Sequence, residues 1–168
     1  MKKEKIRTFA KLGYTHMDTA EMVVKLNKLL AEYQVFFQKL RCYHWNVTGA
    51  DFFELHEKFE SMYDQAYKNI DEIAEKIRLF GQKPLGTFRE YMQYSEIIES
   101  DYPEKLTAFE MVKDVLNDTR NILSVMEECI HSALEINDFG TEDMVKSYIR
   151  QLEKDHWMLT AWQNQDIV

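Results

Sequence analysis

The sequence predicts an all-α protein, a four-helix bundle with one long crossover between its second and third long helices. Three observations lead to this fold class. Apolar residues recur at three- and four-residue steps over four long segments, which places them on one face of a helix. Only 5 glycines and 2 prolines occur in 168 residues, a balance that favours long uninterrupted helices over a sheet with many turns. Both prolines lie between residues 81 and 103, where the one long connection is therefore expected.

The first two long helices are predicted from their start and stop residues. Asp18 offers an acceptor side chain to the backbone N–H groups that open the first helix, and residues 46–49 end it. Asp51 repeats the start signal, and Gly81 stops the second helix. The link between the two helices is short, so we expect them to pack against each other in antiparallel directions.

The second half of the chain is predicted to contain one short helix and two long ones. The short helix is expected at residues 88–94, within the crossover. The third long helix begins near Thr107, whose capping-box partner is Glu110, and the fourth occupies about residues 141–162. At about 3.3 Å per extended residue, the crossover can run back along a helix of about 43 Å, so the second and third long helices are expected to be parallel.

Composition limits the class of protein. Residues 1–168 have the length of a single domain with a substantial core. No apolar run reaches the roughly 18–20 residues that span a bilayer, and none follows the basic N-terminus, so we expect neither a membrane span nor a signal peptide. Cys42 and Cys129 lack a metal-type spacing, and a reducing, cytoplasmic setting is expected.

Residues 1–17 are predicted to form a basic N-terminal arm. Within residues 2–11, five lysine and arginine side chains stand against the single acid Glu4. Such an arm is either a solvated tail or a short contact to nucleic acid phosphates. The net charge of −8 is carried by the body of the chain, and its field opposes a polyanion, so any DNA binding is expected to be weak.

Two E-x-x-H motifs occur on the third and fourth long helices, at Glu128–His131 and at Glu153–His156. Di-iron carboxylate bundles use this spacing. However, the two helices are antiparallel across a short turn, with His131 about 9 Å before the turn and His156 about 22 Å beyond it. The motifs are then staggered by roughly 13 Å, so we do not expect them to form one metal centre within a subunit.

Two other pairs of side chains are candidates for metal binding. His44 lies about one turn before the first helix ends and His56 about one turn after the second begins, so antiparallel packing brings them to the same height. Asp71 and Glu75 are one helical turn apart, where like charges repel by about 0.2–0.5 kcal/mol unless a cation offsets them. Imidazoles and carboxylates are both metal ligands. Each pair alone also fits an ordinary role, as hydrogen-bonded histidines at a core edge or as a solvated acidic face.

The segment from His44 to Lys76 resembles a known family. It reads HWNVTGADFFELHEKFESMYDQAYKNIDEIAEK and is similar to the signature region of the Dps miniferritins, with H-W-N-V-x-G, then F-x-x-L-H-x-x-F, and then D-E-x-A-E. Looser similarity extends to residues 154–158 and to the four-helix layout. The chain departs from the usual pattern at Lys76, where the family has arginine, a change that we expect to be structural and mild.

The resemblance implies a ferritin-like fold and a set of iron ligands. The two histidines of the signature, here His44 and His56, bind iron in the family, and the acids of D-E-x-A-E, here Asp71 and Glu75, complete the centre. Glu60 stands where many members have an aspartate near a second iron position, which makes it a further candidate ligand. Either a di-iron or a mononuclear ferroxidase centre is compatible with these residues.

The resemblance also implies a function. We expect an iron-storage and detoxification protein: a cytoplasmic homododecamer that oxidises Fe(II), with hydrogen peroxide as the expected oxidant, stores ferric mineral in a hollow cage and limits oxidative stress. One alternative is a DNA-compacting protective protein whose iron chemistry is secondary. Another is a cage or bundle that has lost metal activity, although the presence of all four ligands argues against it.

Helix geometry predicts that such a centre is shared between two subunits. His56 and Asp71 are 15 residues apart on one helix, about 22 Å along its axis, and Glu75 is about 28 Å away. One chain therefore does not bring all the ligands to one ion. A two-fold axis that pairs second helices in antiparallel directions places Asp71 and Glu75 of one subunit beside the histidines of the other, twice.

Two further surface features are predicted from the sequence. Three aromatic residues lie off the core stripe of the second helix and are expected at an interface: Phe53, Tyr63 and Tyr67. Three acids near the start of the fourth long helix either form an acidic ion path around a symmetry axis or only favour the helix dipole: Asp138, Glu142 and Asp143.

Overall fold

The computed structural model describes residues 13–100 and 102–164, and the predicted all-α bundle is confirmed. The described part of the chain contains four long helices and a short one in the crossover, together with the 3₁₀ turn η2. Their bounds are α1 His16–Asn46, α2 Phe52–Leu79, α3 Phe88–Tyr94, η2 Pro103–Lys105, α4 Ala108–Glu135 and α5 Phe139–Gln163. Residues 1–12, which hold the basic side chains of the predicted arm, lie outside the described residues.

Helix α1 begins three residues earlier than predicted, because its cap is Thr15 and not Asp18. Thr15 and Asp18 form a capping box, in which Thr15 Oγ1 accepts from the Asp18 N–H while the Asp18 carboxylate accepts from the Thr15 N–H at 2.8 Å. Asp18 is therefore the third helical residue rather than the cap. The predicted box of Thr107 and Glu110 does open α4. Capping boxes therefore fix where α1 and α4 begin.

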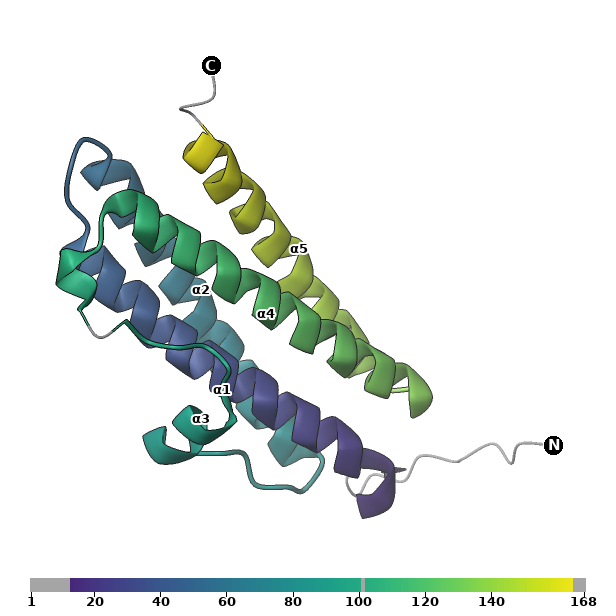
Figure 1. The fold of residues 1–168 in the computed structure, drawn as a ribbon. Helices are drawn as coiled ribbons and strands as arrows, with labels where there is room; N and C mark the ends of the chain where they lie inside the picture. The colour runs from purple at the N-terminus through teal and green to yellow at the C-terminus, as the bar shows by residue number, and fades with distance from the viewer. Residues whose placement is uncertain (1–12, 101, 165–168) are drawn as a thin grey trace.

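The two halves of the bundle are helical hairpins joined by the crossover. Figure 1 shows α1 antiparallel to α2 and α4 antiparallel to α5, with α2 and α4 running in the same direction as predicted. The α1–α2 turn passes through Gly49 at φ 110°, a left-handed backbone that a residue with a side chain adopts only with strain. This short turn keeps the end of α1 next to the start of α2.

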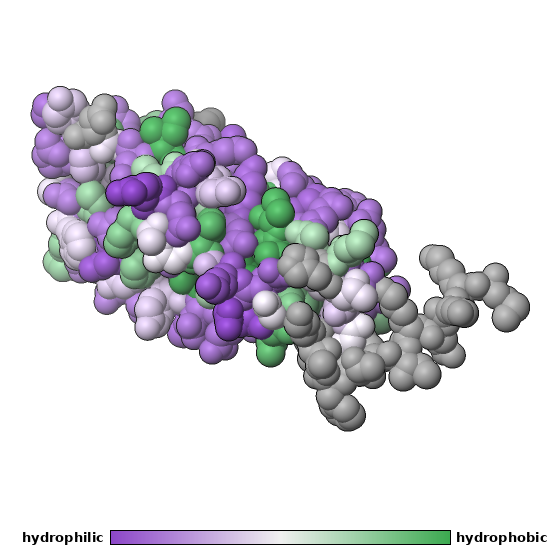
Figure 2. All heavy atoms as spheres, turned by 90° about the horizontal axis from the view of Figure 1, so that it is seen from below, coloured by the Kyte–Doolittle hydropathy of each residue, from purple (hydrophilic) through white to green (hydrophobic). Residues whose placement is uncertain are grey.

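The apolar stripes of the four long helices meet in one core. Fully buried members include Leu26, Leu30, Leu40, Phe59, Ile73, Ile77, Met111, Val115, Ile122 and Val145. The surface in Figure 2 is mainly hydrophilic, with apolar groups in separate patches. Among the described residues, no helix combines the length and apolar character needed to cross a bilayer.

A buried carboxylate of α1 holds the crossover on the bundle. Glu32 is 0% exposed, and it accepts hydrogen bonds from Ser95 Oγ at 2.7 Å and from the backbone N–H of Glu96 at 2.9 Å. The N–H of Ile97 also donates to it, at 3.3 Å. The chain after α3 is therefore attached to α1 before it reaches α4 (Figure 1).

Replacement of Glu32 by glutamine is expected to destabilise the crossover. The amide keeps one acceptor oxygen but turns an NH₂ group toward backbone donors, which leaves buried N–H groups without a partner at a cost of about 2–3 kcal/mol. The midpoint of urea unfolding should fall accordingly. The matched control is Glu96→Gln, because its contact with Lys28 is largely exposed and is expected to contribute less than about 1 kcal/mol. Equal shifts of the unfolding midpoint for both variants would contradict the role of Glu32 in holding the crossover.

Candidate metal centre

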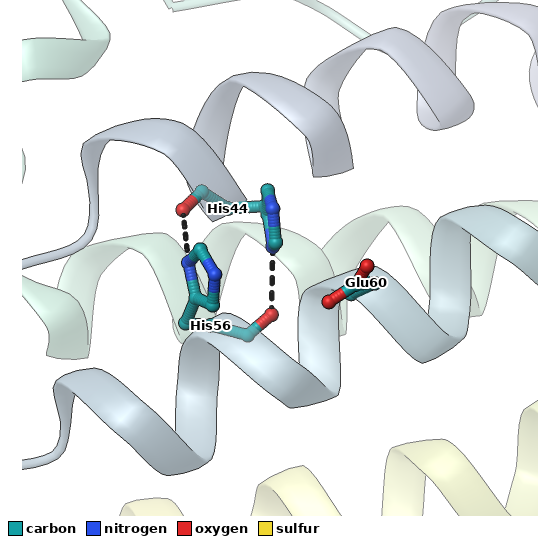
Figure 3. A group of neighbouring side chains, drawn as sticks. All are labelled: His44, His56 and Glu60. Carbon is teal, nitrogen blue, oxygen red and sulfur yellow. Dashed lines mark hydrogen bonds between the residues drawn. The ribbon is translucent and has the colours of Figure 1, made fainter.

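The end of α1 and the start of α2 hold two histidines in a reciprocal arrangement. The His44 Nδ1–H donates to the backbone carbonyl of His56 at 2.8 Å, and the His56 Nδ1–H donates to the carbonyl of His44 at 2.8 Å. Figure 3 shows both bonds. The two rings are stacked, with centroids 3.7 Å apart and planes inclined by 21°. Each histidine therefore fixes the orientation of the other.

This arrangement also fixes the tautomer of both rings. A carbonyl oxygen only accepts, so each Nδ1 must carry a proton. In the neutral imidazole the lone pair then lies on Nε2, the atom left free to bind a metal. Histidine ligands in metal sites commonly donate their second ring N–H to a carbonyl in this way, which orients the ring and raises its basicity. The pair is thus organised for metal binding before any ion arrives.

Glu60 joins the histidine pair from one turn further along α2. Ligand atoms of His44, His56 and Glu60 all lie within 4.8 Å of one another. Among residues 13–100 and 102–164, no other group of three or more potential metal ligands has its ligand atoms this close together. His44 is buried, His56 is half-buried and Glu60 is exposed, so the group opens to solvent on the carboxylate side. Two neutral imidazoles and a carboxylate form a mixed N/O site, which suits iron, zinc or copper.

Tyr63 supports this group from the next turn of α2. Its ring meets the His44 ring edge-on at 5.3 Å, and its hydroxyl donates to Glu60 Oε1 at 3.4 Å. Desolvation raises the pKa of Tyr63, and the neighbouring carboxylate of Glu60 adds to this, so the phenol remains a hydrogen-bond donor at neutral pH. The sequence predicted only an interface role for Tyr63. Its position seven residues after His56, on the same helical face, was the available signal.

Asp71 and Glu75 do not join the histidines within one chain. Both are exposed on α2, and the fold keeps α2 continuous between His56 and Asp71, a separation of about 22 Å. The structure thus brings together three of the five predicted site residues and leaves the other two at the opposite half of the same helix. The roles of all five as iron ligands stay predictions.

The two E-x-x-H motifs are used differently. His156 Nδ1 lies 2.8 Å from Thr119 Oγ1, and the Thr119 hydroxyl donates to the Leu116 carbonyl at 2.8 Å, so His156 acts as the donor to Thr119. Burial, and then the charge of Arg120, lowers the pKa of His156. His131 is exposed on α4. Neither histidine belongs to a group of converging ligands among the described residues.

The acidic-path prediction was wrong for Asp138. Asp138 is buried, its carboxylate is 3.2 Å from Lys76 Nζ, and it accepts the Thr141 N–H at 3.3 Å as the cap of α5. It joins α2 to the α4–α5 turn and is not free to attract ions. Glu142 pairs with Lys146 at 2.5 Å, which leaves Asp143 as the exposed acid of the three. Asp138 is buried and not exposed because it is the residue just before α5, where its side chain caps the helix.

Comparisons with known proteins agree with the fold. A family model described as a ferritin-like domain matches residues 23–166. The chain is 40% identical over 145 residues to DNA protection during starvation protein 2 of Bacillus anthracis, covering 86% of this chain and 98% of that protein. It is 37% identical over 141 residues to the DNA protection during starvation protein of Brevibacillus brevis, covering 84% and 93%.

Solved structures give the same picture. The Dps protein of Vibrio cholerae O1, described as a member of a broad superfamily of ferritin-like diiron-carboxylate proteins, superposes with a TM-score of 0.86 at 33% identity, over 95% of this chain and 98% of that one. A Dps protein from Bacillus brevis superposes with a TM-score of 0.83 at 34% identity, over 89% and 99%. The similarity therefore covers nearly the whole of each chain.

Proposed function

This chain belongs to the Dps group of ferritin-like proteins, and we propose that it is an iron-storage and detoxification protein with ferroxidase activity. In this proposal it oxidises Fe(II) with hydrogen peroxide and stores the ferric product inside a hollow, oligomeric cage. The observation that carries the proposal is the reciprocal histidine pair, which presents two Nε2 lone pairs beside the carboxylate of Glu60. The assembly and the chemistry are proposals for this chain that its family membership supports.

Iron is the substrate of this site. Mixed imidazole and carboxylate ligands bind Fe(II) without the soft, tight grip of thiolates, so the ion can be oxidised and passed on. Two Fe(II) ions each give one electron to one peroxide, whose O–O bond breaks, and two protons complete two waters. The carboxylates near the site stabilise the higher charge of Fe(III).

A second copy of the chain would complete the ligand set. Three of the candidate ligands converge at one end of the exposed face of α2, and Asp71 and Glu75 lie toward the other end. A two-fold axis between two α2 helices places the acids of each chain at the histidines of the other. Exposed aromatic side chains on α2 support such an interface, since Phe53 is 76% exposed and Tyr67 65% exposed in the isolated chain.

Anaerobic titration tests the proposal. Fe(II) is added without oxygen, peroxide follows, and ferric absorbance is recorded together with the Fe(II) consumed per peroxide. The expected ratio is about 2 Fe(II) to 1 peroxide, the two-electron stoichiometry that separates ferroxidase chemistry from radical-forming single-electron chemistry. The matched control is His131→Ala, an exposed histidine outside the site. Iron oxidation no faster than in buffer, or equal losses for His56→Ala and His131→Ala, would refute the proposal.

DNA protection is the second candidate function. The names of the relatives and the five basic side chains within residues 2–11 favour it, whereas the net charge of −8 opposes it. A gel shift at low and at physiological salt separates the two functions. Contact through phosphates alone weakens steeply as salt rises. Retention of DNA at physiological salt would favour the DNA-compacting function.

A further inference from the structure

One exposed face of α2 carries a pattern that is symmetric about its middle. At 100° per residue, a sector of about 120° that also holds Glu57 and Asp64 contains the candidate ligands of α2 and two tyrosines. In chain order these are His56, Glu60, Tyr63, Tyr67, Asp71 and Glu75. Candidate ligands therefore occupy both ends of the face and tyrosines occupy its centre.

The two-fold operation of the shared site fixes where the axis crosses α2. It must bring the His56 and Glu60 end of one helix onto the Asp71 and Glu75 end of the other. The midpoint of these two ends falls between Gln65 and Ala66. On the exposed face Asp64 and Tyr67 lie equally close to that midpoint, each about 2 Å from it along the helix axis, and Tyr67 is the aromatic residue of the two.

Tyr67 is an exposed aromatic residue that is suited to an interface. Its side chain is 65% exposed, although one side of its ring rests on Phe37 with centroids 6.2 Å apart. The rings of Phe37 and Tyr63 are in turn packed edge to face, with centroids 6.1 Å apart. The Tyr67 ring is therefore supported from below by two packed aromatic rings. Large aromatic side chains that are held in place on a surface are the usual anchors of interfaces.

We propose that Tyr67 packs against Tyr67 of the partner subunit at the two-fold axis of the site-forming dimer. An isologous contact places each residue near the axis beside its own copy. The two Tyr67 Cα positions are offset by about 4–5 Å along antiparallel helices, within the roughly 8–10 Å that separates packed helix axes. This inference rests on the proposed function, because the shared site supplies the axis.

Site-specific cross-linking tests the position of the axis. Tyr67→Cys is made in a Cys42→Ser background, and a short bis-maleimide is added without iron; Cys129 is fully buried and needs no replacement. The matched control is Ser61→Cys, exposed on the side of α2 that faces the α5 cleft. Most of the Tyr67→Cys protein is expected to run as a covalent dimer on a denaturing gel, with little dimer for Ser61→Cys. Equal yields of dimer for the two variants would overturn the inference.

A charge substitution gives an independent reading if the cysteine geometry is unfavourable. Tyr67→Asp places two like charges at the axis, and we expect the dimer dissociation constant to rise at least about tenfold, since adjacent like charges at an interface are costly. Ser61→Asp should leave it unchanged. Both measurements are made without iron, so they can establish the Tyr67 contact at the two-fold axis even if the protein does not oxidise Fe(II). If the protein oxidises Fe(II) but shows no Tyr67 cross-link and no effect of Tyr67→Asp, the Tyr67 contact is ruled out and the proposed function is not.

Discussion

Protein that carries His44→Ala with His56→Ala, and protein that carries Asp71→Ala with Glu75→Ala, should each lose nearly all iron oxidation. We expect losses of at least about 100-fold, because even residues that only orient a metal ligand contribute about 10–100-fold. When the two variants assemble together, each mixed dimer has one site with both histidines and both acids. Random pairing at equal amounts should restore about a quarter of the wild-type activity per subunit.

This complementation test separates a shared site from one built within a subunit. A matched control replaces Glu128 and His131, one of the two E-x-x-H motifs, and should leave oxidation nearly unchanged because His131 is exposed and lies outside the converging group. Co-assembly is verified by native mass measurement before activity is read. Mixed assemblies that form but remain as inactive as their parents would rule out sharing.

Replacement of Lys39 by methionine should cause the largest loss of stability among single substitutions. Lys39 is 3% exposed, and its Nζ lies 2.7 Å from Asp118 Oδ2 and 2.8 Å from Asp114 Oδ2. Asp118 is also buried, and the Tyr43 hydroxyl donates to Asp114. Methionine fills a similar volume but leaves two acids without their cation, which costs about 3–5 kcal/mol when one partner of a buried pair is removed.

The pH dependence of this loss follows from Asp118. Burial raises the pKa of Asp118 to about 6 from 3.8, although Lys39 acts in the opposite direction. Asp118 therefore binds its proton more tightly in the folded state than in the unfolded state. The stability that the protonated acid contributes is lost as pH rises from about 4 through about 6. Without Lys39 the pKa should rise further, and lowering the pH from about 7 to 5 should restore part of the stability of Lys39→Met.

A double variant checks this explanation of the Lys39 effect. Adding Asp118→Asn to Lys39→Met removes the buried charge that has lost its partner and should raise the unfolding midpoint at neutral pH. It should also flatten the change in stability between about pH 5 and 7, measured by urea unfolding at each pH. A single variant that unfolds at the wild-type midpoint, or a double variant less stable than the single one, would contradict the role of Lys39.

The sequence by itself determined the helices and their order. Apolar steps of three and four residues identify one face of a helix, and the capping box of Thr107 with Glu110 is a local pattern, so both can be recognised without tertiary information. The separation of His56 from Asp71 follows from the rise of a continuous helix alone. That rise was enough to predict that one chain does not gather all the ligands, and the structure keeps these residues on one unbroken α2.

Tertiary structure decided what each face meets. The sequence placed His44 and His56 at one height, but only the packed helices reveal that each ring donates to the other's carbonyl and so frees both Nε2 atoms. The same holds for Asp138, which the sequence offers as an exposed acid and the fold buries against Lys76. Periodicity reports the direction of a side chain along its own helix, whereas the tautomer, the ion pair and the burial depend on a neighbour that is distant in sequence.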